Sequence, residues 1–365
     1  MDKTLKQIKK LLEDEGPLKA RAIARKLGFD RSDVSALMHK HKDVEFHQNE
    51  NFEWVLMPEE IVVKFDNCWV TCFLFEEALS IEIEDIHTID KIRFVVPENC
   101  KFMLEAIARF LALCNQLVLS KKEVTIDLSS NNSSKAYWNR AGFFDHLSDK
   151  VNVLPKRPKI SSAKTYKGKS GNLVEFGEVD PETDNKKLVR HLTDTFISLS
   201  SDNYEDPAFT ILSELIGNIK EHSGSSLKGF AALQRYKGKT KSSPPHIQTT
   251  VSDNGVGIAT TLRPVLKKFY PKLLELSDIE LVKKAMSEGR ITRFGTKSGH
   301  GLGFKSSKEK ALKFNAKYSV RQNNFSLEFI FKNGELLPVK MLPNLVEISG
   351  THICFDFDID ASDST

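Results

Sequence analysis

The sequence is poor in cysteine and in long hydrophobic runs. Its five cysteines include one close pair, Cys68 and Cys72, but no second pair that would complete a zinc site. No segment approaches the ~20 consecutive apolar residues that a membrane-spanning helix needs. The charged N-terminus, MDKTLKQIKKLLEDEG, lacks the apolar core of a signal peptide. We therefore expect buried, reduced thiols in a soluble, cytoplasmic protein that does not contact a membrane.

A large excess of one charge sign is also absent. The formal net charge is +4, with 28% charged and 40% hydrophobic residues, which is ordinary for a globular protein. This balance excludes a histone-like or polybasic membrane-binding chain. The 365 residues leave room for two or three domains, each with its own core.

Residues 1–57 form the first predicted domain. Hydrophobic periodicity predicts three helices, at 4–13, 18–28 and 30–41. Asp30 stands at the N-cap position of the third helix. Two short alternating runs around residues 49–51 then predict a β-hairpin. Three helices followed by a hairpin resemble a winged helix-turn-helix domain, which can place its third helix in a DNA groove.

The third predicted helix carries a modest set of polar side chains. They are Arg31, Ser32, Ser35, His39 and Lys40. These side chains suit contacts with DNA, but two acids lie nearby, and a docking or dimerisation module explains the pattern as well. DNA, a protein partner and a second copy of the chain are therefore all kept as candidate partners.

Residues 60–154 predict an α/β domain. Strands are expected at 61–65, 68–75, 92–96 and 124–128, and helices at about 101–119 and leading into 137–147. This strand–helix order resembles the STAS domain of bacterial anti-sigma-factor antagonists. In those antagonists a phosphorylatable Ser begins the first helix, where this sequence reads PENCKF (97–102). The resemblance therefore implies a partner-binding or sensing module rather than a phosphorylation substrate.

A basic linker precedes the last predicted domain, and a regularly spaced set of polar residues lies within it. Residues 155–174 are rich in Pro, Lys, Ser and Gly and predict a basic, solvated linker. Further on, the apolar stretch ELIGNIKEHSG contains Glu214, Asn218 and His222 at intervals of four residues. Steps of four stay on one side of an α-helix, here predicted over about 206–222 after an earlier helix at about 184–199. A surface helix with its polar face in water would give the same pattern.

Glycine-rich stretches follow this helix. DNGVGIA (253–259) comes directly after the predicted strand HIQTTVS, and its glycines let the backbone approach a ligand closely. In SGHGLGF (298–304), three glycines alternate at a predicted helix start, where free backbone N–H groups suit phosphate. Finally, ISGTHICFDF (348–357) places a Gly-Thr pair before a closing strand. Each motif alone is weak evidence.

Taken together and in this order, the motifs resemble the GHKL ATP-binding superfamily of gyrase, heat-shock chaperones, histidine kinases and MutL. The resemblance covers about residues 175–358 and leaves a short tail, 359–365. It implies an α+β protein whose last domain is an α/β sandwich, a mixed sheet with helices on one face. It also implies ATP and Mg²⁺ as cofactors, with a mobile lid over the nucleotide between about residues 258 and 299.

The resemblance implies a role for each motif residue. Asn218 would ligate a Mg²⁺ that bridges the phosphates, since this ion prefers oxygen ligands. Glu214 would orient or deprotonate the attacking group, and Asp253 would accept a hydrogen bond from the adenine amino group. His222 would reach phosphate oxygens or cap its helix. The remaining positions would contact the adenine side (Gly255, Gly257 and Thr351) or cradle the phosphates (Gly299, Gly301, Leu302 and Gly303).

Several parts found elsewhere in the superfamily are missing. Too few residues follow Thr351 for the lysine-bearing domain of gyrase and the chaperones, and no helical hairpin with an acceptor His precedes residue 175. The local likeness is nearest to the anti-sigma-factor serine kinases. The leading interpretation is a regulator that binds and slowly hydrolyses ATP, and whose nucleotide state controls partner engagement by the other domains. A serine/threonine kinase acting on a separate STAS protein and an ATP-gated DNA-binding regulator are the alternatives.

Overall fold

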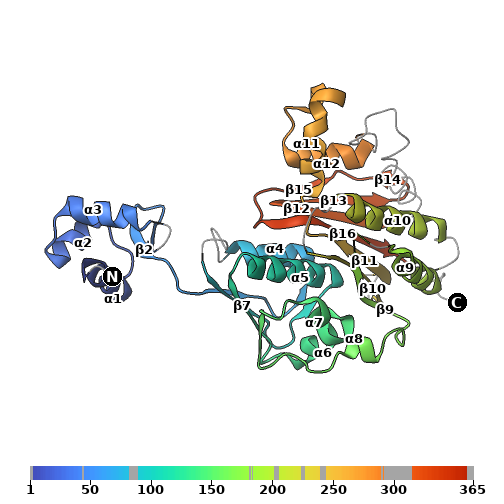
Figure 1. The fold of residues 1–365 in the computed structure, drawn as a ribbon, viewed down its shortest axis with the longest axis horizontal. Coiled ribbons are helices and arrows are strands. Elements are labelled where there is room, and N and C mark those ends of the chain that lie inside the picture. The colour runs from blue at the N-terminus through green and yellow to red at the C-terminus, as the bar shows by residue number, and fades with distance from the viewer. Residues whose placement is uncertain are drawn as a thin grey trace.

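The structure is a computed structural model and forms three units of mixed α/β character (Figure 1). It describes residues 3–42, 45–81, 89–180, 182, 184–200, 205–222, 227–238, 244–288, 291 and 315–359, with only the backbone described for 81, 205–207 and 218–222. We call residues 3–57 the N-terminal unit, 60–172 the middle unit and 173–359 the third unit.

The N-terminal unit contains three helices and a two-stranded hairpin, as predicted. Its elements are α1 (Lys3–Glu15), α2 (Ala20–Leu27), α3 (Arg31–Lys40), β1 (Phe46–Gln48) and β2 (Trp54–Leu56). The Asp30 carboxylate accepts the backbone N–H of Ser32 at 2.7 Å and caps α3. Gly28 ends α2 in the left-handed conformation, with φ of 71°. The unit has its own small core and lies to one side of the other two units (Figure 1).

The middle unit is built on a parallel sheet. Its strands lie in the order β3 (Ile61–Lys64), β5 (Lys91–Val95), β7 (Glu123–Asp127) and β8 (Asn152–Leu154). A separate short pair joins β4 (Trp69–Val70) to β6 (Lys101–Phe102). The helices between the strands are α5 (Leu104–Leu119), α6 (Asn132–Ala141) and α7 (Phe143–His146). The predicted order of strand, helix, strand and helix from residue 92 to residue 147 is therefore confirmed.

One prediction in the middle unit is wrong. The apolar run at 68–75 was expected to be one strand, but only Trp69–Val70 is extended, and α4 (Cys72–Ile81) follows. A continuous apolar run fits a buried strand and a buried helix equally well. Here Cys72, Phe75 and Leu79 are buried at helical spacing, so packing on one face selects the helix.

The third unit is built on an antiparallel sheet. Its strands are β9 (Leu173–Val179), β10 (Gly229–Tyr236), β11 (His246–Ser252), β12 (Ala316–Asn323), β13 (Phe325–Lys332), β14 (Glu335–Leu336), β15 (Lys340–Leu342) and β16 (Ile348–Asp358). They lie in the order β14-β13-β12-β16-β11-β10-β9, with β15 beside β13. Every described strand pair of this sheet is antiparallel, so the prediction of a mixed sheet is wrong. The closing strand β16 inserts between β11 and β12 and runs opposite to both.

Helices cover both faces of this sheet, whereas one covered face was expected. On one face lie α9 (Lys186–Leu199) and α10 (Glu205–His222), which pack with alternate strand residues such as Val320 and Phe355. On the other face lies α5 of the middle unit, packed against β11 and β16. Every residue of α5 is buried except Gln116 and Leu119. The middle unit therefore supplies the layer that the third unit lacks on that side (Figure 1).

The region predicted as a lid is helical where it is described. Helix α11 (Gly257–Phe269), a 3-10 turn η2 (Pro271–Leu273) and α12 (Asp278–Glu288) project from the edge of the sheet (Figure 1). Leu266 and Leu281 pack together in a small core of their own. These helices begin directly after the glycine turn at 253–257.

The expected solvated linker is instead attached to the middle unit. Arg157 donates to the carbonyl oxygen of Leu147 at 2.9 Å, and the Asn139 amide donates to that of Ile160 at 3.1 Å. A short helix, α8 (Ser162–Thr165), follows. The buried backbone carbonyls around Leu147 need donors, and the guanidinium of Arg157 supplies them. Composition alone does not reveal such an anchoring residue.

The predicted state of the thiols is confirmed for four cysteines. All five are free, and all except the partly exposed Cys68 are buried. Within the described ranges, no helix is both long and apolar enough to cross a bilayer.

Candidate functional site

The turn after β11 has the tight geometry that its glycines predict. Asp253 ends the strand region, and its carboxylate accepts the backbone N–H of Gly255 at 2.6 Å. Gly257 begins α11 with φ of 83°, a conformation that side-chain-bearing residues rarely adopt. The turn therefore holds a carboxylate in a fixed position at the edge of the sheet.

The Gly-Thr pair of β16 lies directly against this turn. The backbone N–H of Asp253 donates to the carbonyl oxygen of Thr351 at 2.9 Å. Gly350 has φ of 95°, and a Cβ atom at this position would lie 2.1 Å from the carbonyl oxygen of Asp253. Only glycine fits such a close backbone contact. Two motifs far apart in the sequence therefore form one structural site.

Gln322 of β12 is a third member of this site that sequence reasoning missed. Its amide donates to the Thr351 hydroxyl at 3.0 Å, and its carbonyl oxygen accepts the backbone N–H of Ala259 in α11 at 3.2 Å. Nothing in the sequence marks this glutamine, because its position depends on the pairing of Gln322 with Thr351 between β12 and β16. It connects the Gly-Thr segment with the start of α11.

The environment of Asp253 disfavours its charged form. Desolvation raises the pKa of its carboxyl from 3.8 to about 6, against the opposing effect of hydrogen bonds from Gly255 and Thr351. The residue as a whole is nevertheless only half-buried. A partly exposed, poorly solvated carboxylate has a strong preference for an additional hydrogen-bond donor.

Glu214 occupies the same face of the sheet as Asp253. It is half-buried on α10, between buried Leu212 and Leu215. The negative charge of Glu214 adds to burial in raising the pKa of Tyr318 on β12, which places the carboxylate near the sheet. The polar stripe of α10 is thus not wholly a solvated surface at this position.

The structure describes the other predicted site residues only by their backbone or not at all. Asn218 and His222 are on α10, but only their backbone is described. Gly299, Gly301, Leu302 and Gly303 lie outside the described residues. Among the residues described with side chains, no three His, Cys, Asp or Glu side chains converge into a metal site.

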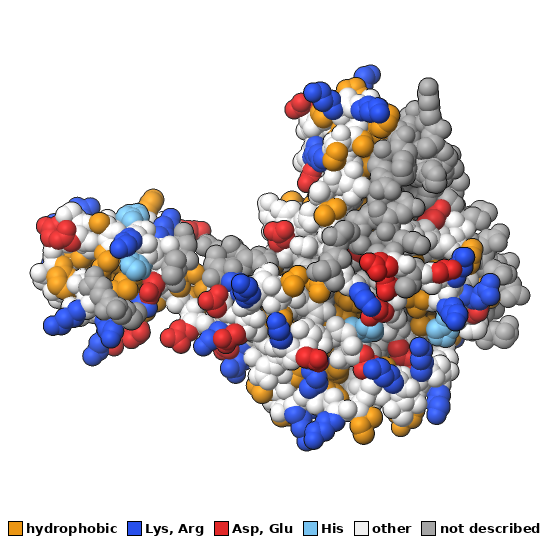
Figure 2. Space-filling view, in the orientation of Figure 1, with side chains coloured by type: hydrophobic (Ala, Val, Ile, Leu, Met, Phe, Trp, Pro, Cys, Tyr) orange, Lys and Arg blue, Asp and Glu red, His pale blue; other side chains and the backbone are white. Residues whose placement is uncertain are grey.

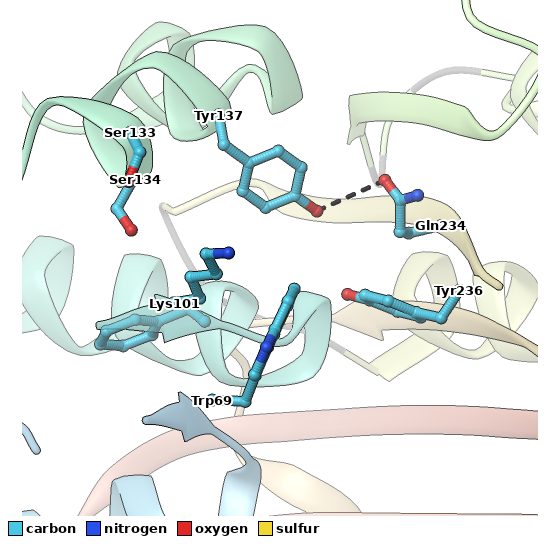
Figure 3. A pocket seen from close by; sticks show the side chains of 8 residues that line it. Trp69, Lys101, Ser133, Ser134, Tyr137, Gln234 and Tyr236 are labelled. Carbon is cyan, nitrogen blue, oxygen red and sulfur yellow. Dashed lines mark hydrogen bonds between the residues drawn. The ribbon is translucent and has the colours of Figure 1, made fainter. Parts of the chain in front are cut away.

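A separate hollow lies between the middle and third units. This cavity of about 290 Å³ is lined by residues of β4, β6, α6 and β10: Trp69, Lys101, Phe102, Ser133, Ser134, Tyr137, Gln234 and Tyr236. Figure 3 shows Tyr137 and Gln234 meeting across it, with a hydrogen bond of 3.4 Å. The Tyr236 hydroxyl also accepts the backbone N–H of Leu104 at the start of α5, at 2.9 Å. The hollow is therefore part of the contact between the two units.

Surface charge gives little indication of a ligand. On the face seen in Figure 2, basic and acidic side chains are interspersed over the N-terminal unit and the rest of the protein. This distribution agrees with the small net charge of +4. The candidate site is therefore defined by the contact of Asp253, Thr351 and Gln322 rather than by a strong surface field.

Comparison with known proteins adds no assignment. The sequence matches no model of a known protein family, and it matches no curated protein.

Proposed function

We propose that the third unit binds ATP with Mg²⁺ and belongs to the GHKL type of nucleotide-binding fold. The observation that carries the proposal is the contact between the Asp253 turn and the Gly350-Thr351 segment. The two motifs were assigned to one adenine site by resemblance alone, and nothing about their spacing in the sequence requires them to meet. The packing of α9 and α10 side by side on the same face of the sheet also supports it, although the sheet itself is antiparallel rather than mixed.

The described residues fit the adenine end of a nucleotide. The Asp253 carboxylate already accepts hydrogen bonds from Gly255 and Thr351 and retains capacity for a further donor, such as the adenine amino group. Gly255 lies beside it and has no side chain, so the backbone there could approach a flat base closely. Thr351 and Gln322 fix the opposite side through their own hydrogen bond. These residues would bind and orient the base.

The residues proposed for the phosphate end of the nucleotide lie on α10 and outside the described ranges. Bound Mg·ATP would supply an electrophilic γ-phosphoryl group, with the metal neutralising phosphate charge. Asn218 would hold the metal, and Gly299, Gly301, Leu302 and Gly303 would receive the phosphates. Glu214, one helical turn before Asn218, would orient or deprotonate the attacking water. His222 would contact phosphate oxygens from the next turn.

We further propose a regulatory role for the nucleotide. The middle unit, read as STAS-like, shares buried residues with the third unit, because Phe176, Phe230 and Ile348 join its core. A change at the nucleotide site would therefore reach the middle unit through packed contacts. The N-terminal unit, read as a winged helix, lies apart and would engage a protein partner (Figure 1). Its exposed α3 residues include both Arg31 and Asp33, which does not favour DNA.

Two measurements on the purified full chain test the proposal. Isothermal titration should detect Mg·ATP binding that is lost or greatly weakened in Asp253→Ala, since this change removes the acceptor for the base. Phosphate release should then be slow in the native sequence and absent in Glu214→Ala. Unchanged affinity in Asp253→Ala would show that the site is wrongly assigned. Binding without turnover would instead direct the search to a separate protein acceptor, as the kinase alternative requires.

A further inference from the structure

We infer that Gln116 of the middle unit is a positioning residue for the adenine end of the site, and that through it the middle unit and the nucleotide control each other. The inference rests on the proposed ATP-binding function. Gln116 lies outside all of the motifs that support that function. Gln116 lies near the end of α5, on the side of the sheet opposite to α9 and α10.

The Gln116 amide is bonded to both segments of the candidate site. Its nitrogen donates to the Asn254 side-chain oxygen at 2.8 Å and to the Ser349 carbonyl oxygen at 2.9 Å. Its oxygen accepts the backbone N–H of Ser349 at 2.8 Å. Asn254 follows Asp253 directly, and Ser349 precedes the Gly350-Thr351 pair. One side chain thus connects the two segments that must stay together for the base to bind.

These bonds cannot be replaced easily from nearby groups. Asn254 is buried, and its nitrogen is already bonded to the carbonyl oxygen of Lys228 at 3.0 Å. Without Gln116, the Asn254 side-chain oxygen and the Ser349 N–H would lose this partner, while the Ser349 carbonyl oxygen would keep its contact with His352 Nε2 at 3.1 Å. The turn and the Gly-Thr segment would still be joined by the pairing of β11 with β16 and by the Asp253–Thr351 hydrogen bond, but Asp253 would be positioned less firmly without this further link.

The consequence is a coupling that works in both directions. If the position of α5 favours the arrangement that binds adenine, binding must favour that position of α5 by the same factor. The coupling should also affect selectivity, because Asp253 distinguishes the amino group of adenine from the carbonyl oxygen of guanine only if it is correctly placed. A partner that displaces the middle unit would therefore change nucleotide affinity.

The neighbouring residue provides a matched control. Asn115 makes the same two kinds of bond, donating to the His146 carbonyl oxygen at 3.0 Å and accepting the Ser148 N–H at 2.8 Å, but within the middle unit. Gln116→Met and Asn115→Leu both remove a side-chain amide from α5 while keeping an apolar stem. We would titrate the full-length native protein and both variants with Mg·ATP and Mg·GTP after confirming folding by circular dichroism.

We expect Gln116→Met to weaken ATP binding about tenfold, as the loss of one or two well-placed hydrogen bonds would, and to reduce the ATP-to-GTP affinity ratio. Asn115→Leu should lower thermal stability and leave that ratio unchanged. Equal affinity and ratio in Gln116→Met and the native protein would overturn the inference alone. A native protein that binds no adenine nucleotide would overturn the proposed function as well, so the two failures differ.

Hydrogen exchange on the native protein provides a second test if Gln116→Met does not fold. Saturating Mg·ATP should slow exchange of the backbone N–H groups that close the end of α5, including those of Lys121 and Lys122, which donate to Val118 and Leu117. This turn belongs to the middle unit and carries none of the proposed nucleotide ligands. Unchanged exchange there under saturating nucleotide would contradict the coupling.

Discussion

Arg321 of β12 and Glu76 of α4 form a buried ion pair that joins the third unit to the middle unit. Arg321 Nε lies 2.9 Å from Glu76 Oε1, and Arg109 of α5 lies 2.9 Å from the same oxygen. All three side chains are buried. One buried carboxylate therefore contacts two buried guanidinium groups at the junction of the two units, where water cannot take its place as a partner.

Glu76→Gln should destabilise the protein strongly. The change keeps the size of the side chain but removes the carboxylate charge that both buried guanidinium groups contact, and breaking a buried ion pair typically costs about 3–5 kcal/mol. Urea denaturation of the full chain would measure the loss in free energy of unfolding. Glu77→Gln is the control, because Glu77 is exposed on the same helix. Equal stability of the two variants would mean that the ion pair does not hold the units together.

Gly350→Ala should both destabilise the protein and abolish nucleotide binding. The added Cβ would lie 2.1 Å from the Asp253 carbonyl oxygen and 2.8 Å from Asn254 Cα, so the two backbone segments must separate. Backbone atoms cannot move aside as a flexible side chain can. A thermal melt and an ATP titration would measure the two effects. Gly171→Ala, at a position with no atom within 4 Å of the new Cβ, should change neither.

Asp253→Asn should stabilise the nucleotide-free protein above pH 7. The native carboxyl has its pKa raised to about 6 by desolvation, above the unfolded value of 3.8. Folding therefore opposes ionisation, and the resulting penalty is full above pH 6 and disappears as pH falls toward 4. The shift corresponds to at most about 3 kcal/mol. The difference in unfolding free energy between variant and native protein, measured from pH 4 to 8, isolates this carboxyl from other titrating groups.

The Asp253 carboxyl should lower folding stability but raise ATP affinity as pH increases. An adenine amino group donates best to the ionised carboxylate, so ATP affinity in the native protein should fall as pH decreases through 6. The phosphates of the nucleotide also titrate near this range. Any part of the dependence that persists in Asp253→Asn therefore comes from them. A dependence identical in both proteins would exclude Asp253 as the adenine acceptor.

Local signals predicted much of the fold. Asp30 and Gly28 mark the ends of helices because capping depends on neighbouring residues alone. The turn that begins at Asp253 is likewise predictable from its neighbouring glycines alone. The strand prediction at 68–75 failed because burial by distant residues, not local pattern, decides between a helix and a strand there. The second covered face of the large sheet also depends on distant packing, since α5 supplies it from another unit.

In the candidate site, too, a local sequence pattern marks some residues, while only the folded structure reveals others. Asp253 and Thr351 are marked by neighbouring glycines, whereas Gln322 and Gln116 are ordinary glutamines in a strand and a helix. Their importance depends on strand register and on contact between units, which one sequence does not display. Tertiary hydrogen bonds of this kind carry no spacing pattern. A single sequence therefore predicts the residues that shape the backbone better than those that support it from a distance.

Native thiol reactivity should be confined to Cys68. Burial raises the pKa of Cys72 and Cys100 to about 12 and keeps the thiols of Cys114 and Cys354 protonated, while Cys68 is partly exposed with its pKa also raised. The thiolate is the reactive form, so native labelling should be slow. Mass spectrometry after iodoacetamide treatment should find one label on the native protein and five after denaturation.

Cys72 makes this labelling a probe of the contact between units. It is buried and lines a cavity of about 210 Å³ together with Ser319 and Ser326 of the third unit, so its labelling should increase when the two units separate locally. In Cys68→Ser, any remaining native label on Cys72 would measure that opening. Glu76→Gln should accelerate it in the same background, because the lost ion pair lies across the same contact. Rapid labelling of Cys72 in the otherwise native protein would contradict the closed arrangement described above.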